Sequence, residues 1–281
     1  MDKQLELELK LFALEIRKRT MESIASIGVG HVGGSMSVAD VLAVLYGHFL
    51  KYDPENPHWA DRDKVVLSKG HAGPALYSAL ALKGFFPVEK LVTLNQNGTM
   101  LPSHADRLKT PGIDVSTGSL GQGSSLAVGL ALSDKLDGKD CYTYLIMSDG
   151  DVDEGQPWEA AAFTTHQKLT HLITIVDHNK LQVDGDTSSV CDLGDLAAKY
   201  AAFGFHTVNV EDGNDIAQIY QALLEARSET QKPTAIILHT VKGCGLTQYA
   251  GKASCHHCAV SKEDLEASLN ELNKTEEQIR G

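Results

Sequence analysis

The sequence predicts an α/β fold of three layers, in which a mostly parallel central sheet lies between two layers of helices. Two observations lead to this prediction. Short apolar runs typical of strands recur along the chain, at 142–147, 172–176, 206–210 and 234–238. They are apolar on both faces, as strands of a covered parallel sheet are. Segments with helical patterning separate these runs, and parallel strands need such crossovers.

The first half of the chain is expected to begin with a long amphipathic helix at about residues 4–27. Leu5, Leu9 and Phe12 fall on one stripe of that helix. A glycine-rich break follows, from Gly28 to Gly34. The other elements expected in this half are a helix at 37–49, a short strand at 64–68, and helices at 74–82 and 124–136.

The second half is expected to continue the alternation of strands and helices. Its expected helices cover residues 157–167, 215–227 and 261–280, and the last of these is strongly charged. No internal repeat, low-complexity stretch or linker interrupts the pattern. We therefore expect a single domain over residues 1–281.

Composition narrows the class of protein. The chain of 281 residues is 42% hydrophobic and has 25 glycines, which is a globular composition. Its formal net charge of −12 repels polyanions, so we expect no nucleic-acid partner. No run approaches the roughly 20 apolar residues of a membrane span. Five scattered cysteines and an N-terminus without a signal-like stretch favour the cytoplasm.

Oxygen-bearing residues follow two of the expected strands. Asp149 comes two residues after the first run, and Asn179 comes three residues after the second. Ligands of parallel sheets bind at the carboxyl ends of strands, and Mg²⁺ prefers oxygen ligands. We therefore expect Asp149, the side chain of Asn179 and the backbone carbonyl of Leu181 to hold a metal ion. Gly150 would let a phosphate approach the backbone. Turn formation and helix capping are the alternative roles for these residues.

An Asp-Gly pair followed about thirty residues later by Asn resembles the thiamine diphosphate motif, with Ser148 in place of its usual first glycine. Four further segments resemble loops of the transketolase family, and the resemblance covers about residues 10–260. These segments are Gly30–Ser35, Asn56–Asp63 with Leu67–Ala72, Ser103–His104, and Gly118–Gly123.

The resemblance implies thiamine diphosphate as cofactor, with Mg²⁺, or Ca²⁺ or Mn²⁺, as its metal. His71 would contact the diphosphate, while His31 and His104 would face the hydroxyl groups of the substrate. Leu120 would lie near the aminopyrimidine, although packing in the core is an equal alternative. Glu154 would join a hydrogen-bonded network between paired active sites, or only stabilise a helix N-terminus. The full set of residues expected to bind the cofactor is His71, Gly118, Ser119, Leu120, Gly150, Glu154 and Asn179.

The segment Cys255-His256-His257-Cys258 suggests zinc at first sight. Four consecutive residues cannot all supply the ligands of one tetrahedral site without strain, so we expect no zinc site there. The transketolase resemblance instead aligns a family histidine with His256, or with His257 after a shift of one residue. That histidine would bind or protonate the substrate oxygen.

The resemblance implies transfer of a two-carbon glycolaldehyde unit from a ketose to an aldose. The family's catalytic glutamate lies in a pyrimidine-binding domain, which we expect on a separate C-terminal subunit in an α2β2 heterotetramer. Whether the ketose carries a phosphate or a sulfonate is left open by the sequence. The alternatives are another thiamine diphosphate enzyme, similar to deoxyxylulose-phosphate synthase, and a non-catalytic regulatory module.

Overall fold

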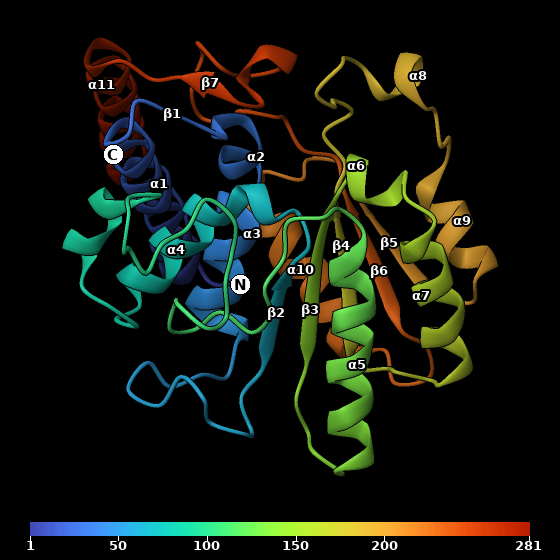
Figure 1. The fold of residues 1–281 in the computed structure, drawn as a ribbon. Helices are drawn as coiled ribbons and strands as arrows, with labels where there is room; N and C mark the ends of the chain where they lie inside the picture. Colours follow the sequence, from blue (N-terminus) through green and yellow to red (C-terminus); the bar gives the residue numbers. More distant parts are fainter.

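A computed structural model describes all residues, 1–281, and confirms the expected fold class. Five strands form one parallel sheet in the order β2-β3-β4-β6-β5. The strands are β2 (Lys64–Leu67), β3 (Thr143–Ser148), β4 (Leu172–Asp177), β5 (His206–Val210) and β6 (Thr234–Leu238). Their carboxyl ends therefore lie along one edge of the sheet, which is at the top of Figure 1.

Helices cover both faces of the sheet, as Figure 1 shows. One face carries α5 (Gln122–Leu136), α7 (Gln156–His166) and α9 (Leu196–Ala202). On the other face, α10 (Ile216–Ser228) packs on β5 and β6, and α3 (Ala39–Val44) packs on α10. Beyond them lie α1 (Lys3–Ala25), α4 (Gly73–Leu82) and α11 (Lys262–Arg280).

Successive residues of β3 enter different hydrophobic cores, because side chains alternate across a strand. Leu145 and Met147 join the smaller core, which contains α5, α7 and α9. Tyr144 and Ile146 join the larger core, which contains α1, α3, α4 and α10. All six residues of β3 are buried, as a strand covered on both faces should be.

A small antiparallel ribbon joins the two halves of the chain above the sheet. It pairs β1 (Val29–Gly30) with β7 (Cys258–Ala259). Figure 1 shows this ribbon beside α2 (Val32–Ser37). The ribbon therefore brings the Cys255–Cys258 segment next to the His31 loop (Gly30–Ser35), although Cys255 comes 224 positions after His31 in the sequence.

Short elements account for most differences from the sequence prediction. The helix expected at 37–49 is observed as α3 followed by a π-helical turn at Leu45–Phe49, and a separate short helix, α2, ends at Ser37 just before it. The other short elements are α6 (Asp149–Val152), α8 (Thr187–Val190) and the 3₁₀ turns Gly70–Ala72, Val88–Thr93 and Ala253–Cys255. The short elements α6, α8 and α9 were not predicted, because periodicity needs a longer window to appear. No helix combines the length and the apolar character needed to cross a membrane.

Candidate active site at the carboxyl edge of the sheet

The register of two central strands brings the expected metal ligands together. Ser148 of β3 pairs with Asp177 of β4, so the residues after both strands share one edge of the sheet. The carboxylate of Asp149 is buried there and has two partners. Its Oδ1 lies 2.5 Å from Nδ1 of His178, and its Oδ2 accepts a hydrogen bond from the Lys180 N–H at 2.8 Å.

The two other expected ligands belong to the loop after β4. Oδ1 of Asn179 accepts a hydrogen bond from the Leu181 N–H at 3.1 Å, and its Nδ2 donates to Asp177 at 3.2 Å. These two bonds fix which side of the amide presents oxygen. The carbonyl oxygen of Leu181 accepts from Nζ of Lys242 at 3.2 Å.

The donor set fits a divalent cation with a diphosphate. It comprises one carboxylate, one amide oxygen and one backbone carbonyl, which suit Mg²⁺ or Ca²⁺. Asn179, Leu181 and Gly150 line the same cavity of about 140 Å³. A methyl group at Gly150 would lie 3.1 Å from Cδ1 of Leu120, so a side chain there would narrow the space beside the expected phosphate position.

Other expected residues border the same cavity. His71, Leu120 and His256 line it, together with the backbone of Gly34. A methyl group at Gly34 would lie 2.9 Å from Nε2 of His71. Glycine is therefore required at this position for the His31 loop to lie against His71.

A buried ion pair lies beneath the site. Asp177 accepts hydrogen bonds from Lys69, Thr240 and Ser37 in addition to Asn179. Burial alone would raise the pKa of Asp177, but the charge of Lys69 and these hydrogen bonds hold it below its usual value. The ion pair and its hydrogen bonds join the ends of β2, β4 and β6 to the end of α2.

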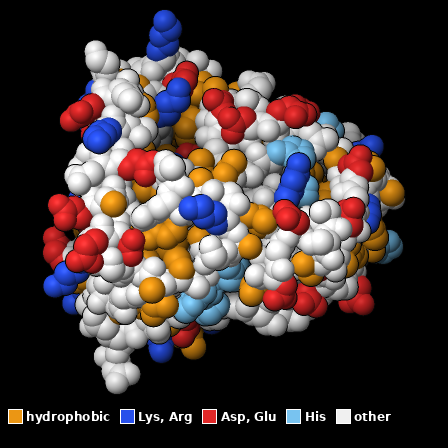
Figure 2. Space-filling view, turned by 90° about the horizontal axis from the view of Figure 1, so that it is seen from above, with side chains coloured by type: hydrophobic (Ala, Val, Ile, Leu, Met, Phe, Trp, Pro, Cys, Tyr) orange, Lys and Arg blue, Asp and Glu red, His pale blue; other side chains and the backbone are white.

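Five histidines gather beside the cavity. The ring centroid of His31 lies 5.3 Å from that of His71, 5.8 Å from His104, 5.4 Å from His256 and 4.6 Å from His257. Figure 2, which views the molecule from above Figure 1, shows histidine side chains grouped on this face.

Four of these histidines, His31, His71, His104 and His256, have a lowered pKa and are neutral at physiological pH. Burial, and then the charges of His257 and His256, lower the pKa of His31 to about 3. Burial and the charge of Lys242 lower the pKa of His256 to about 4. The pKa of His71 is also lowered well below its usual value, first by burial and then by Lys69. A neutral imidazole can both donate and accept a hydrogen bond, which suits contacts to sugar hydroxyls.

The structure distinguishes the two adjacent histidines of the 255–258 segment. His256 is half-buried and lines the cavity, and its Nδ1 lies 3.2 Å from Nζ of Lys242. His257 is exposed and is not part of the cavity wall, although its ring lies near that of His31. The role of Lys242 was not anticipated from the sequence.

The cysteines of this segment lie on either side of its histidines. The thiol of Cys255 is buried and donates to the Lys252 carbonyl at 2.9 Å. Burial, followed by the neighbouring Cys255, raises the pKa of Cys258 to about 11. No three His, Cys, Asp or Glu side chains in the structure are arranged to hold a metal ion. The expected metal site at Asp149 is not such a group, because its other two ligands are the amide oxygen of Asn179 and the backbone carbonyl of Leu181.

Asp151 holds the glycine loop (Gly118–Gly123) against the strand ends. This role was not predicted from the sequence. Oδ1 of Asp151 accepts from the Gly121 N–H at 2.8 Å and from the Ser68 hydroxyl at 2.5 Å. Its Oδ2 accepts from the N–H and the hydroxyl of Ser148. The spacing Ser-x-x-Asp between Ser148 and Asp151 is a capping-box signal that could have revealed this role.

The remaining expected residues lie at the rim. Gly118 and Ser119 belong to the loop before α5, and Ser119 is exposed. Glu154 is also exposed and lies in the turn between α6 and α7, not at the start of a helix. A methyl group at Gly121 would lie 3.0 Å from Cβ of Glu154, so the glycine loop passes directly beside this acid.

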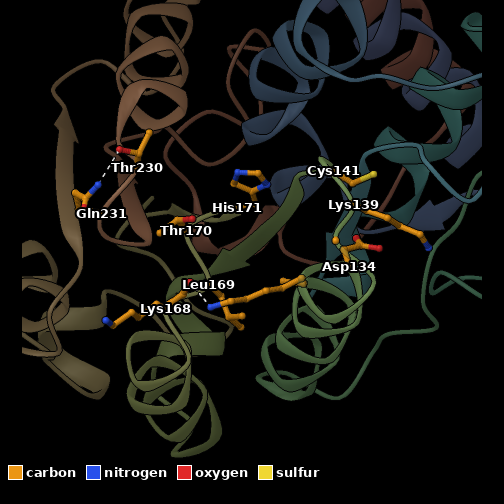
Figure 3. Close-up of a pocket in the computed structure, with 12 residues that line it drawn as sticks. Asp134, Lys139, Cys141, Lys168, Leu169, Thr170, His171, Thr230 and Gln231 are labelled. Carbon is orange, nitrogen blue, oxygen red and sulfur yellow. Dashed lines mark hydrogen bonds between the residues drawn. The ribbon is translucent and has the colours of Figure 1, made fainter.

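A larger cavity of about 450 Å³ lies at the opposite edge of the sheet. Figure 3 shows its lining, which includes Lys139, Lys168 and His171 near the amino ends of the strands. It contains none of the expected site residues. Ligands of parallel sheets bind at the carboxyl edge, so we place the site at the smaller cavity.

Comparisons with known proteins point to one family. A sequence family described as "Transketolase, thiamine diphosphate binding domain" matches residues 9–278. The chain is 49% identical over 269 residues to the 6-deoxy-6-sulfo-D-fructose transketolase subunit of Clostridium sp., covering 96% of this chain and 98% of the relative. It is 35% identical to a subunit of the apulose-4-phosphate transketolase of Phocaeicola vulgatus, covering 96% of each.

Solved structures of transketolases share the fold over nearly the whole chain. The transketolase of Campylobacter jejuni superimposes with a TM-score of 0.89 at 31% identity, covering 97% of this chain and 43% of that one. The Leishmania mexicana transketolase gives a TM-score of 0.85 at 29% identity, covering 97% of this chain and 45% of that one. The chain thus spans less than half of these solved enzymes.

Proposed function

The chain belongs to the family of transketolase thiamine diphosphate binding domains, and from that premise we propose that it is the diphosphate-binding subunit of a split transketolase. It is a transferase subunit that moves a two-carbon glycolaldehyde unit from a ketose to an aldose. The observation that supports this proposal is that Asn179, His71 and His256 line one cavity, while Asp149 follows the strand paired with β4 at the same edge of the sheet.

The two-subunit organisation is supported by the relatives. The two similar proteins named as transketolase subunits match across 98% and 96% of their own lengths. The transketolase 2 of Escherichia coli matches across only 41% of its length. We therefore propose a partner subunit that carries the pyrimidine-binding domain and the catalytic glutamate, in an α2β2 assembly. The cytoplasmic location expected from the sequence stays a prediction.

The chain's own residues would hold the cofactor by its diphosphate. We assign the cation, Mg²⁺ in the first place, to Asp149, Asn179 and the carbonyl of Leu181, and the diphosphate to Gly150 and His71. When bound, thiamine diphosphate supplies the carbon nucleophile that takes up the two-carbon unit. The side of the cofactor site that faces the partner subunit would be formed by Gly118, Ser119, Leu120 and Glu154.

The neutral histidines would orient the sugar and move its protons. His31 and His104 would bind hydroxyl groups, since a neutral imidazole offers one donor and one acceptor. His256 is placed deeper, in the cavity wall. Its Nδ1 faces the Lys242 ammonium, so Nε2 would carry the proton that it donates to a substrate oxygen.

A sulfonated ketose is the donor that we propose first. The supporting observation is that the relative named for 6-deoxy-6-sulfo-D-fructose is 49% identical, whereas those named for apulose 4-phosphate are 35% and 36% identical. A sulfonate and a phosphate are both tetrahedral anions, so the chain's histidine cluster does not by itself select between them.

The test combines this chain with its partner subunit, Mg²⁺ and thiamine diphosphate. Two-carbon transfer is measured by aldose consumption, with sulfonated and phosphorylated ketoses as donors and each polypeptide by itself as control. We expect transfer only in the mixture, with the sulfonated donor preferred. Cofactor binding without transfer from any donor would contradict the transketolase assignment, and preference for a phosphorylated donor would contradict only the substrate.

A further inference from the structure

Lys242 is a buried lysine whose ammonium contacts two different parts of the candidate site. Its Nζ lies 3.2 Å from the carbonyl oxygen of Leu181 and 3.2 Å from Nδ1 of His256. Because a carbonyl oxygen can only accept, the ammonium donates a hydrogen bond to the Leu181 carbonyl. One side chain therefore joins the expected metal loop to the expected substrate histidine.

The fold holds this lysine in place. Its carbonyl accepts from the Gly251 N–H at 2.8 Å, and the adjacent Gly243 N–H donates to the Gly33 carbonyl at 3.0 Å. A methyl group at Gly33 would lie 2.9 Å from Cγ of Lys242. The absence of a side chain at Gly33 therefore leaves room for the lysine stem beside α2.

No carboxylate forms an ion pair with Lys242. The other buried lysine of the cavity wall, Lys69, is paired with Asp177. Lys242 instead relies on the Leu181 carbonyl and His256. Its positive charge is thus not neutralised by any carboxylate in contact with it, and the ammonium repels a second cation at the same oxygen.

We propose that Lys242 serves as an internal cation at the Leu181 carbonyl, so that a divalent cation binds tightly only together with a diphosphate. Without a diphosphate, a divalent cation at this oxygen is repelled by the ammonium of Lys242. A diphosphate brings negative charges that offset both cations. This inference rests on the proposed function, because it uses the same metal ligands. Lys242 is thereby a positioning residue that couples two binding events.

The experiment measures Mn²⁺ binding by electron paramagnetic resonance, since Mn²⁺ is a spectroscopic substitute for Mg²⁺. Titrations are made on the chain combined with its partner subunit, with and without thiamine diphosphate. The variants are Lys242→Met and Lys242→Gln. The matched control is Lys252→Met, which removes the same charge from an exposed lysine bonded to the Gln248 carbonyl. Thermal unfolding of each variant identifies any that does not fold, and Lys242→Gln, which keeps a polar group, then decides the test.

We expect both Lys242 variants to bind Mn²⁺ without diphosphate about tenfold more tightly than the wild type, which is within the usual range of coupling between sites. The enhancement by diphosphate should shrink by the same factor, and the Lys252 control should match the wild type. Unchanged or weaker Mn²⁺ binding without diphosphate in folded Lys242 variants would overturn the inference. If the wild type binds no Mn²⁺ even with diphosphate, the metal assignment fails, which is a distinguishable result.

Discussion

The side-chain amide of Asn179 donates to the carboxylate of Asp177 at 3.2 Å, at the carboxyl end of β4. Asp177 is only 1% exposed, and its other partners are Lys69, Thr240 and Ser37. The expected metal ligand is thus oriented by a buried ion pair below it. Supporting groups of this kind hold a ligand in the geometry that the metal needs.

Replacing Asp177 should damage both stability and metal binding. Asp177→Asn leaves the Lys69 ammonium buried without a counter-charge, which typically costs about 3–5 kcal/mol. Urea unfolding of the apo chain measures that loss. A change below about 1 kcal/mol would show that the ion pair is not a main support of the strand ends.

The same ion pair makes stability depend on pH. The pKa of Asp177 is lower in the folded state, so its stabilising effect is complete above the unfolded pKa of about 3.9 and is lost as the pH falls through the folded value. Thermal unfolding from about pH 6 down to about pH 3 measures this loss. The slope should be smaller in Asp177→Asn, and an identical slope would contradict the assignment.

Asp149 is the residue on which metal-dependent cofactor binding should depend most. Asp149→Ala removes the only carboxylate among the three expected ligands. We expect the affinity for Mg²⁺ with thiamine diphosphate to fall by at least about 100-fold, the upper end of the loss seen for residues that only support a ligand. Calorimetric titration measures it. Asp184→Ala, an exposed acid at the same cavity, is the control and should change affinity little.

The two adjacent histidines should differ in function. His256→Ala should lower kcat of the complete enzyme by about 100-fold, the lower end of the contribution of a positioned acid or base. His257→Ala should change kcat by less than about tenfold, because this side chain is exposed and does not line the cavity. Steady-state kinetics with one ketose donor compare them, and the reverse order would assign the role to His257.

The histidine cluster should destabilise the fold in mild acid. The folded pKa of His31 is about 3, far below its unfolded value of about 6.5. The unfolded chain therefore binds more protons between these values, and stability falls as the pH drops below about 6.5. Urea unfolding at about pH 5 and pH 7 measures the difference. It should be smaller in His31→Gln, while His166→Gln, at the exposed end of α7, is the control.

Asp151 should stabilise the position of the glycine loop (Gly118–Gly123). Asp151→Leu keeps a side chain of similar size but has no acceptor for the Gly121 N–H and the Ser68 hydroxyl. Leaving buried donors without partners costs about 1–3 kcal/mol. Chemical unfolding measures this cost, and hydrogen exchange at Gly121 should become faster. Unchanged exchange at that amide would show that other contacts hold the loop.

Local sequence patterns predicted the sheet and the residues that follow its strands. The strands expected at 172–176 and 234–238 agree with β4 and β6 to within one residue. A strand buried on both faces has a strong apolar signal of its own, so its position needs no knowledge of distant residues. Asp149 and Asn179 were proposed as ligands for the same reason, because each lies within two residues of the end of such a strand.

Short elements and distant contacts could not be predicted from local patterns. The β1–β7 ribbon has only two residues in each strand, too few for any periodicity. It nevertheless decides that His256 and His257 lie beside His31. The choice between these two histidines, left open by the alignment with the family, depends on which ring enters the cavity wall.

The sequence by itself determined the fold class, the order of the main elements, the family resemblance and the residue types of the site. Those features are set by composition and by neighbours along the chain. Only the tertiary structure placed Lys242 between the Leu181 carbonyl and His256 and put Asp177 beneath Asn179. Their roles come from distances between chain segments, and such distances are fixed only when strands pair in register and helices pack over them.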